Sequence, residues 1–398
     1  MFWLGKKILL TGHTGFKGSW MSLWLQRLGA DVTGYSLAPP TCPSLFETAS
    51  VASGIRSITG DVCDLAQLKK ALAVSEPEIV FHMAAQSLVR VSYEDPILTY
   101  RTNVLGTANL LEGVRTTESV RAVVVITTDK CYENCNWVWG YREIDRLGGR
   151  DPYSNSKACA ELVVSAYRDS FFETCGRHAR PLALASARAG NVIGGGDWAR
   201  DRLIPDAIRS FAEGKSLKIR NPQATRPWQH VLEPLRGYLM LAQSLHEQGS
   251  SFASAWNFGP KPGDSRPVRW IVERIASAWN SPVTWEIDGG ENPHEAQMLQ
   301  LDCSKAVQQL GWCPALDIEE ALSMTIDWYR DCLHGKSARE KCLEQIAAYS
   351  ARFDHEHVPL VDKRVIPPAK RGANALSRHR RFRVPRVVAG PASVEPRT

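Results

Sequence analysis

Tyr153 and Lys157 stand four residues apart at the start of a predicted helix, directly after Asp151-Pro152. Residues at positions i and i+4 share one face of a helix, so these two side chains would lie side by side. An ammonium group beside a phenol lowers the phenol pKa from about 10 towards neutrality, which makes the phenolate a usable base. The spacing also occurs by chance, so the pair alone is compatible with two ordinary surface residues.

A glycine-rich turn near the N-terminus gives this pair a context. The predicted strand Lys7–Thr11 runs directly into Gly12, Gly15 and Gly18, and an amphipathic helix is predicted over 17–28. Glycines in this arrangement give a pyrophosphate a tight turn, a close backbone approach and helix N–H groups aimed at the anion. The pattern predicts a dinucleotide site, and a purely structural turn is the alternative.

Positions after later strands support a dinucleotide. Asp61-Val62 follows the third predicted strand, where a carboxylate can meet adenine, and the small pair Ala84-Ala85 after the fourth lets a cofactor lie close. The acid usually found after the second strand is missing, and Tyr35 and Ser36 occupy its place. No arginine is present there to bind a 2′-phosphate, and its absence favours NAD over NADP. The predicted cofactor contacts are Gly12, Thr14, Gly15, Phe16, Lys17, Gly18, Asp61, Val62, Ala84, Ala85, Tyr153 and Lys157.

These residues need a scaffold, and the first half of the chain alternates short apolar runs with longer helical patterns. That rhythm is typical of an α/β fold, a Rossmann-type doubly wound parallel sheet with right-handed crossovers. Thr127 and Thr128 fall at the C-terminal end of a predicted strand, where ligands bind in such sheets. Strands are predicted at 7–11, 31–35, 55–59, 79–83, 122–127 and 182–187, and helices at 17–28, 64–73, 96–116 and 154–172.

The pattern changes after residue 188, where GNVIGGGDW is rich in glycine. The segments leading to Gly214 and over 268–279 look helical without matched strands, and the last convincing helix is predicted near 319–332. We therefore predict an NAD-binding Rossmann domain over 1–188 with return segments near 228–260, and a smaller interleaved substrate domain mainly over 189–350. A basic, disordered tail is predicted over 355–398.

Composition and charge exclude several classes of protein. Of the net charge of +6, residues 361–398 contribute +8 (ten Lys/Arg against two acids), so the rest of the chain sums to −2 and only the tail is basic. No stretch approaches the ~18–20 uninterrupted apolar residues of a membrane span. The ten cysteines show neither a CxxC pair nor zinc spacing, which predicts reduced thiols in a cytoplasmic protein and no metal site.

Taken together, these motifs resemble the extended short-chain dehydrogenase/reductase superfamily, in particular its nucleotide-sugar dehydratases. The resemblance covers about residues 4–350 and rests on the glycine turn, the AAQ string at 84–86, Asn103, Thr128-Asp129-Lys130 and the Tyr153/Lys157 pair. Longer strings such as TGHTGFKGSWMSLWL, TTDKCYEN and GNVIGGGDWARDRLIPD are similar to the members that act on CDP-glucose. The resemblance implies NAD as cofactor, CDP-glucose as substrate and a lyase reaction that makes a 4-keto-6-deoxy sugar for a surface polysaccharide.

The resemblance also implies catalytic roles. Tyr153 would take the proton of the glucose 4-hydroxyl while hydride leaves C4, Lys157 would lower the tyrosine pKa and hold the nicotinamide ribose, and Thr128 would bond the 4-oxygen. Asp129 would be the general acid for the departing C6 hydroxyl. Lys130 stands where the better-known dTDP-glucose dehydratases carry a glutamate base for C5, so the C5 base stays open. A turn role for Asp129 and a solvated loop lysine at 130 are the alternatives.

On the substrate side, a nucleoside diphosphate needs cationic and aromatic partners. The resemblance and the position of these residues in the predicted fold indicate substrate contacts at Gln86, Arg90, Asn191, Arg202, Arg226, His230 and His294. Trp198 and Trp228 could be stacking platforms or core residues. The superfamily also implies a homodimer in which helices 96–116 and 154–172 form a four-helix bundle.

Two further functions remain open from the sequence. A dehydratase or 4-epimerase acting on another nucleotide sugar would keep Tyr153 and Lys157, although an epimerase has no use for an acid at Asp129. A non-catalytic protein could contact nucleic acid through the basic tail. Because that tail has no aromatic platform beyond Phe382, we expect an enzyme without a nucleic-acid or membrane partner.

Overall fold

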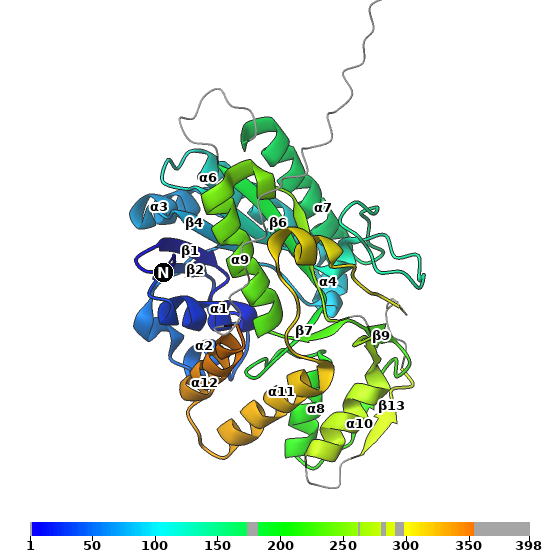
Figure 1. The fold of residues 1–398 in the computed structure, drawn as a ribbon. Coiled ribbons are helices and arrows are strands. Elements are labelled where there is room, and N and C mark those ends of the chain that lie inside the picture. Colours follow the sequence, from blue (N-terminus) through cyan, green and yellow to red (C-terminus); the bar gives the residue numbers. More distant parts are fainter. Residues whose placement is uncertain (1, 173–181, 262, 280–283, 291–297, 354–398) are drawn as a thin grey trace, which may run out of the picture. The chain divides into compact units, whose positions relative to one another are not determined.

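A seven-stranded sheet organises the part of the chain that the computed structural model describes, residues 2–172, 182–261, 263–279, 284–290 and 298–353. All neighbouring strands are parallel, in the order β11-β6-β5-β4-β1-β2-β3 (Figure 1). The order reverses between β1 and β4, and ligands of such sheets bind at the carboxyl ends of the strands beside that point. The strands are β1 Lys7–Thr11, β2 Asp31–Ser36, β3 Arg56–Thr59, β4 Ile79–His82, β5 Ala122–Ile126, β6 Ala183–Ala189 and β11 Ala255–Phe258.

The central strands are continuous apolar runs because both of their faces are covered. Every residue of β4 and β5 is buried, and β5 reads AVVVI. All six strands predicted from the sequence are found, within two residues of the expected bounds. The seventh, β11, comes from the return segment near 228–260 and pairs with β6.

Two layers of helices cover the sheet, and alternate strand residues pack against each. On one face Leu9 and Val80 join the cluster that includes α3, α6 and α7, while on the other Leu10 and Phe81 pack in the cluster of α1, α9, α11 and α12. The helices are α1 Phe16–Arg27, α2 Leu45–Thr48, α3 Leu65–Ser75, α4 Val89–Glu94, α5 Pro96–Tyr100, α6 Gly106–Arg115, α7 Pro152–Tyr167, α8 Leu203–Ala212, α9 Leu232–Gln248, α10 Val268–Ala278, α11 Ile318–Leu333 and α12 Ala338–Ala351. Short 3₁₀ or π turns are η1 Val51–Gly54, η2 Arg101–Leu105, η3 Asp129–Cys131, η4 Arg168–Phe172, η5 Gly249–Phe252 and η6 Ala306–Leu310.

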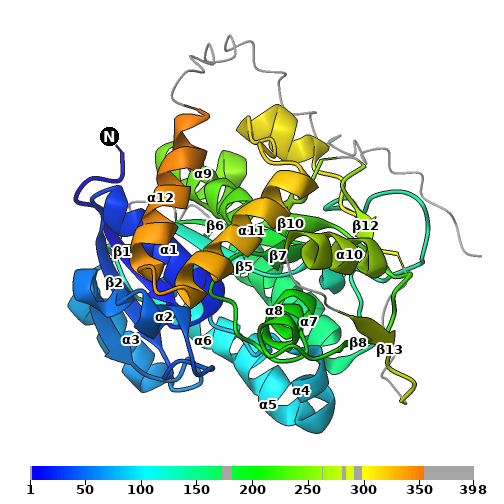
Figure 2. The same ribbon diagram turned by 90° about the horizontal axis from the view of Figure 1, so that it is seen from below.

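Three two-stranded sheets accompany α8 and α10 in the second half of the chain. Figure 2 shows β8 and β13 near α8 and α10, on the side away from β1 and β2. The pairs are β7 Asn191–Ile193 with β10 Trp228–His230, β8 Leu217–Ile219 with β13 Trp285–Ile287, and β9 Thr225–Arg226 with β12 Arg266–Pro267. Contacts group residues Met1–Asp354 into one unit, so the division into domains at 188 stays a prediction. The predicted tail over 355–398 lies outside the described residues.

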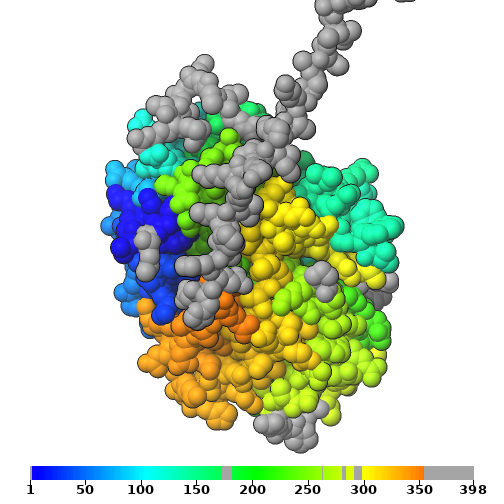
Figure 3. All heavy atoms as spheres, in the orientation of Figure 1, coloured from blue at the N-terminus to red at the C-terminus, as the bar shows by residue number. Residues whose placement is uncertain are grey.

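Four helices depart from the sequence prediction, namely the short α2 and α4 and the longer α9 and α12. Helix α9 was not expected, and α12 follows the helix that we predicted to be the last. Helix α12 packs on α1, where Arg339 donates to Oε1 of Gln26 at 2.8 Å and Tyr349 meets Trp24 edge to face. Figure 3 shows the corresponding orange surface beside the blue N-terminal surface. Within the described ranges, no helix is both long enough and apolar enough to cross a membrane.

Candidate active site

A cavity of about 780 Å³ opens at the carboxyl ends of the central strands. Its wall includes the first turn of α1, the segment after β5, the start of α7 and the segments around β7, β8 and α8. This is where the reversal of strand order leaves a crevice in a doubly wound sheet. The predicted site residues in its wall are Phe16, Lys17, Arg90, Thr128, Lys130, Tyr153, Asn191, Arg202 and Arg226.

The glycine turn has the geometry that a dinucleotide diphosphate requires. Gly12 has φ +77°, and a Cβ built on it would lie 2.6 Å from the main-chain nitrogen of Ala84. A Cβ on Gly18 would lie 2.1 Å from the carbonyl oxygen of Gly12. At Gly15, by contrast, a Cβ would meet only that same oxygen, at an ordinary contact distance of 3.5 Å, so a side chain would fit there without a clash. The turn therefore fits a dinucleotide at the N-terminus of α1.

Tyr153 and Lys157 lie on the first two turns of α7, whose N-cap Asp151 accepts a hydrogen bond from the main chain of Ser154. Tyr153 is 7% exposed and faces the cavity. Lys157 is buried, and its Nζ lies 3.4 Å from the carbonyl oxygen of Ile126 at the end of β5. Strand β5 and helix α7 thus hold the two side chains on one side of the site.

The acid–base properties of the pair differ from the sequence prediction. Burial raises the pKa of Tyr153 to about 12, although hydrogen bonding with Thr128 and the charge of Arg202 act in the opposite direction. Burial also lowers the pKa of Lys157 to about 8, against the attraction of Glu161. The predicted lowering of the tyrosine pKa is therefore wrong for the protein alone, because desolvation of the phenolate outweighs the nearby cations.

Thr128, Asp129 and Lys130 follow β5 after Thr127, and Thr128 and Lys130 line the cavity. The Thr128 side chain caps the 3₁₀ turn η3 and donates to Oδ1 of Asp129 at 2.9 Å. Asp129 is 1% exposed, and burial raises its pKa despite the nearby charges of Lys130 and Arg226. Lys130 is half-buried in the cavity wall. Asp129 thus has the environment of a carboxyl group that keeps its proton to higher pH than an ordinary aspartate.

Several cations line the wall opposite this segment. Arg202 forms an ion pair with Asp197 at 2.8 Å and donates to the Ser87 hydroxyl at 3.0 Å. Arg90 pairs with Asp201 at 3.3 Å. Arg226 is buried in the same wall. The cavity is also lined by Arg209, Lys218 and Arg220, which the sequence prediction did not include. The spacing of Arg202, Asp206 and Arg209 across α8 is the sequence signal that would have indicated this wall.

Other predicted residues have different surroundings. His230 is fully buried beside Trp20, and burial lowers its pKa to about 3, so it is a neutral core residue rather than part of the described cavity wall. The Gln86 amide bonds the main chain of Leu88 in its own loop and donates to the hydroxyl of Thr99 on α5. Asp61 accepts from the main chain of Cys63, and Val62 lies in the core. His294 falls outside the described residues.

Thr14 and the alanine pair support the glycine turn. The Thr14 hydroxyl bonds Ser36 at 2.9 Å and the carbonyl of Leu37 at 3.0 Å, which ties the turn to the end of β2. Ala84 approaches Gly12 closely, and both Ala84 and Ala85 are half-buried. In the described part of the chain, no group of three His, Cys, Asp or Glu side chains could hold a metal ion.

A dinucleotide-type turn and a tyrosine–lysine pair meeting at the crevice of a doubly wound sheet define an extended short-chain dehydrogenase/reductase. Within this class, the chain belongs to the GDP-mannose 4,6-dehydratase family, whose model matches residues 9–325.

Individual proteins similar to the chain include both enzymes and solved structures. It is 54% identical over 335 residues to CDP-glucose 4,6-dehydratase of Salmonella typhimurium, covering 84% of this chain and 93% of that protein. It resembles the structure of MoeE5 in complex with UDP-glucose and NAD, with 26% identity, a TM-score of 0.68 and coverage of 82% of this chain and 99% of the other. The dTDP-glucose 4,6-dehydratase of Bacillus anthracis in complex with NAD has the same fold, with 20% identity, a TM-score of 0.68 and coverage of 83% and 98%.

Proposed function

We propose that the protein converts CDP-D-glucose into CDP-4-keto-6-deoxy-D-glucose, by oxidation at C4, loss of water across C5 and C6, and reduction at C6. The observation that carries this reaction is the buried carboxyl of Asp129, which accepts a hydrogen bond from the hydroxyl of Thr128, a residue that lines the same cavity as Tyr153. An epimerase does not need such an acid. The 54% identity to CDP-glucose 4,6-dehydratase over most of both chains supports the choice of substrate.

NAD is the proposed cofactor, held by the glycine turn and the N-terminus of α1. Bound there, it would accept a hydride from C4 of the sugar and return it to C6. The tight approach of Gly12 to Ala84 and the absence of a clash at Gly15 support this placement of the diphosphate. The NAD named in the titles of the similar structures supports the same cofactor.

The side chains of the protein then move protons and hold the substrate. Tyr153 takes the proton of the 4-hydroxyl, and the ammonium of Lys157 favours the phenolate. Thr128 orients the 4-oxygen. Asp129 gives its proton to the departing 6-hydroxyl, a role that burial of the carboxyl favours because it raises the pKa.

The substrate diphosphate is assigned to the cationic wall. Guanidinium groups match phosphate oxygens, and Arg90, Arg202 and Arg226 all line the cavity. The side-chain oxygen of Asn191 is buried and has no hydrogen-bond partner in the described residues, so it is free to accept from the ligand. Gln86 and His294 remain expectations from the sequence.

The base that removes the C5 proton is not assigned. Lys130 lines the cavity immediately after Asp129, in the place where a carboxylate was expected from related dehydratases. A lysine acts as a base only when it is neutral, and as a cation it stabilises a developing enolate instead.

Product analysis tests the proposed function. The purified protein is incubated with NAD and, in separate reactions, with CDP-glucose, dTDP-glucose, UDP-glucose and GDP-mannose. Mass spectrometry is expected to show loss of one water from CDP-glucose, together with 4-keto absorbance in alkali. Loss of water from another sugar alone would change the substrate. A product of unchanged mass would indicate an epimerase, and no reaction with any of the four would reject a dehydratase.

A homodimer and a cytoplasmic location complete the proposal, with the product feeding deoxysugars of a surface polysaccharide such as the lipopolysaccharide O-antigen. Ile97, Leu105 and Leu162 are 75%, 50% and 59% exposed, beside an apolar groove on α5, η2, α6 and α7. A second copy of these helices would bury them as a four-helix bundle. The described cysteines are all free, which supports a reducing compartment. Light scattering of the wild type and of Leu105→Arg tests the dimer, since the variant is expected to be monomeric.

A further inference from the structure

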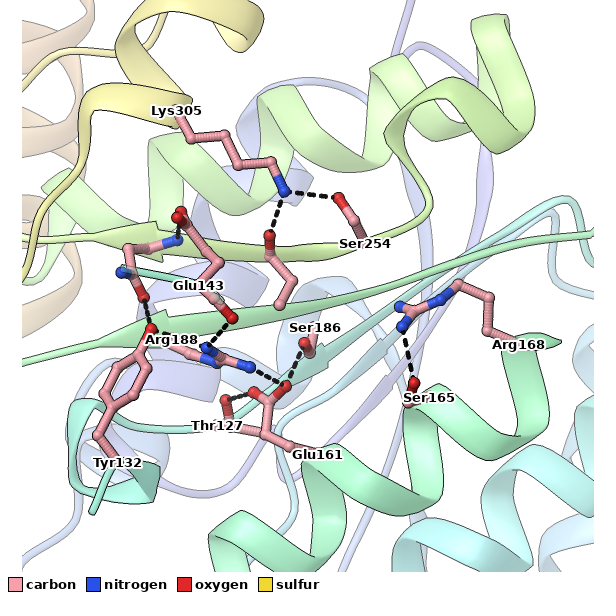
Figure 4. Close-up of polar contacts among 12 residues, drawn as sticks. Thr127, Tyr132, Glu143, Glu161, Ser165, Arg168, Ser186, Arg188, Ser254 and Lys305 are labelled. Atoms are coloured by element: carbon pink, nitrogen blue, oxygen red, sulfur yellow. Dashed lines mark hydrogen bonds and ion pairs between the residues drawn. The ribbon is translucent and has the colours of Figure 1, made fainter. Parts of the chain in front are cut away.

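A buried ion pair lies beneath the proposed catalytic residues and takes no part in the chemistry. Glu161 of α7 and Arg188 of β6 meet at 2.8 Å, and each side chain is 3% exposed (Figure 4). Ion pairs that are removed from water cost desolvation energy, which only good geometry and further hydrogen bonds repay. The arrangement around this pair meets that requirement.

The Glu161 carboxylate joins three elements. One of its oxygens accepts from the hydroxyl of Thr127, which directly follows β5, and the other accepts from Ser186 of β6 at 2.6 Å and from Arg188. Burial alone would raise the pKa of Glu161, but Arg188 and the two hydroxyl donors hold it below its usual value. Glu161 is therefore a fixed negative charge that ties α7 to two strands.

Arg188 extends the connection to the far side of η3. Its guanidinium donates to the Tyr132 hydroxyl at 2.7 Å and lies 4.9 Å from the centre of that ring. The Tyr132 hydroxyl in turn donates to Oδ1 of Asn257 in β11 at 2.8 Å. Figure 4 shows Thr127, Glu161, Arg188 and Tyr132 as one connected group.

Three members of this group lie close in the chain to a proposed catalytic residue. Glu161 lies one turn after Lys157, Thr127 immediately precedes Thr128, and Tyr132 closes the segment that carries Asp129. We propose that Glu161 is a positioning residue, which fixes α7 and the segment 127–132 in one arrangement and keeps the positive charge on Lys157. This inference rests on the proposed function for the roles of Tyr153 and Asp129 only.

Other groups around Lys157 do not replace Glu161. Lys17 from α1 repels its charge, and burial keeps His82 of β4 neutral, with a pKa of about 3. Burial raises the pKa of the Cys131 thiol, so this group carries no charge near neutral pH. Removing the charge of Glu161 should therefore lower the pKa of Lys157 below its value of about 8.

The test is Glu161→Gln, which keeps the shape of the side chain and removes its charge. NMR titration of protein labelled with ¹³C-lysine, with the Lys157 signal assigned by its loss in Lys157→Met, is expected to show the Lys157 pKa lower by about one unit. The alkaline limb of the kcat/KM profile should move to lower pH by the same amount, and kcat should fall by about tenfold or more through misplacement of the reacting groups. The matched control is Glu112→Gln, which breaks the exposed pair with Arg115 on α6 and should change neither quantity.

The outcomes separate this inference from the proposed function. A Glu161→Gln protein with the wild-type Lys157 pKa and wild-type kcat would overturn it. If Glu161→Gln does not fold, Glu161→Asp serves instead, because it keeps the negative charge but has a shorter side chain. In this variant kcat should fall while the Lys157 pKa stays unchanged. A wild-type kcat in Glu161→Asp would reject the positioning role. The NMR titration needs no substrate, so it remains decisive even if CDP-glucose is not turned over.

Discussion

The hydroxyl of Thr128 donates to Oδ1 of Asp129, while Oδ2 of the same buried carboxyl has no hydrogen-bond partner in the described part of the chain. A charged carboxylate would be poorly solvated in this position, which is why burial raises the pKa of Asp129. The carboxyl is thus suited to hold a proton until a leaving hydroxyl takes it.

Asp129→Asn removes this proton and should therefore separate oxidation from dehydration. We expect steady-state turnover of CDP-glucose to fall by about 10²–10⁴-fold, the usual contribution of a general acid, while a single-turnover mixture still develops the absorbance of a reduced nicotinamide. In the wild type, dehydration should decline as the pH rises through the raised pKa of Asp129, because the acid form is lost. The exposed variant Asp169→Asn is the control. Equal loss of both half-reactions would contradict the assignment.

Tyr153→Phe should block oxidation at C4. The two side chains differ only in the phenolic hydroxyl, which is the group that takes the proton of the 4-hydroxyl. A reduction in kcat of about 10²–10⁴-fold is expected, with the thermal unfolding temperature close to that of the wild type. Tyr167→Phe, on the same helix but outside the cavity wall described here, should behave as the wild type. Retention of C4 oxidation by Tyr153→Phe would exclude this residue as the base.

The strands were predictable because their pattern is local. In β5, Val123 packs on one helix layer and Val124 on the other, and a short β-branched run such as AVVVI is typical of a strand covered on both faces. Helix α9 was missed because its pattern is not clear in the sequence: most of its residues are buried, so it shows no continuous polar face. Pro234 and Gly237 further weaken the helical signal.

Within the site, motif positions were predictable but environments were not. The sequence indicates Tyr153 and Lys157 from spacing, yet their pKa values depend on burial that only the folded chain creates. His230 follows Arg226 by four residues in the sequence, but its strand β10 turns the ring into the core next to Trp20. The partners of Glu161 come from separate strands, and a single sequence gives no sign that they meet.

The glycine turn allows a matched pair of substitutions. A Cβ at Gly18 would lie 2.1 Å from the carbonyl oxygen of Gly12, so Gly18→Ala must move backbone and should lower the free energy of unfolding by on the order of 1–3 kcal/mol. A Cβ at Gly15 meets that oxygen at an ordinary 3.5 Å, so Gly15→Ala should unfold like the wild type. Because its methyl group would occupy the space assigned to the diphosphate, calorimetry should show weaker NAD binding. Wild-type affinity in Gly15→Ala would place the diphosphate elsewhere.

Lys17, in the first turn of α1, lines the cavity beside the glycine turn to which we assign the cofactor diphosphate. Its ammonium lies 5.8 Å from the centre of the Tyr238 ring and forms no ion pair with a carboxylate of the described residues. Burial, together with repulsion by Lys157 and Arg202, lowers the pKa of Lys17 to about 7, against the attraction of Asp129. The charge of Lys17 therefore changes near neutral pH.

Two phosphate groups bound at the glycine turn should raise the Lys17 pKa, so NAD binding should take up a proton near pH 7. Since the protonated form binds better, affinity should be constant at low pH and fall as the pH rises through about 7. Calorimetric titrations in two buffers of different ionisation enthalpy measure this uptake directly. Lys17→Met should abolish it and weaken binding at pH 6 by about tenfold, equivalent to ~1.4 kcal/mol, whereas the exposed control Lys215→Met should retain both properties. Unchanged uptake in Lys17→Met would mean that another group titrates with the cofactor, and the cationic role of Lys17 would have to be abandoned.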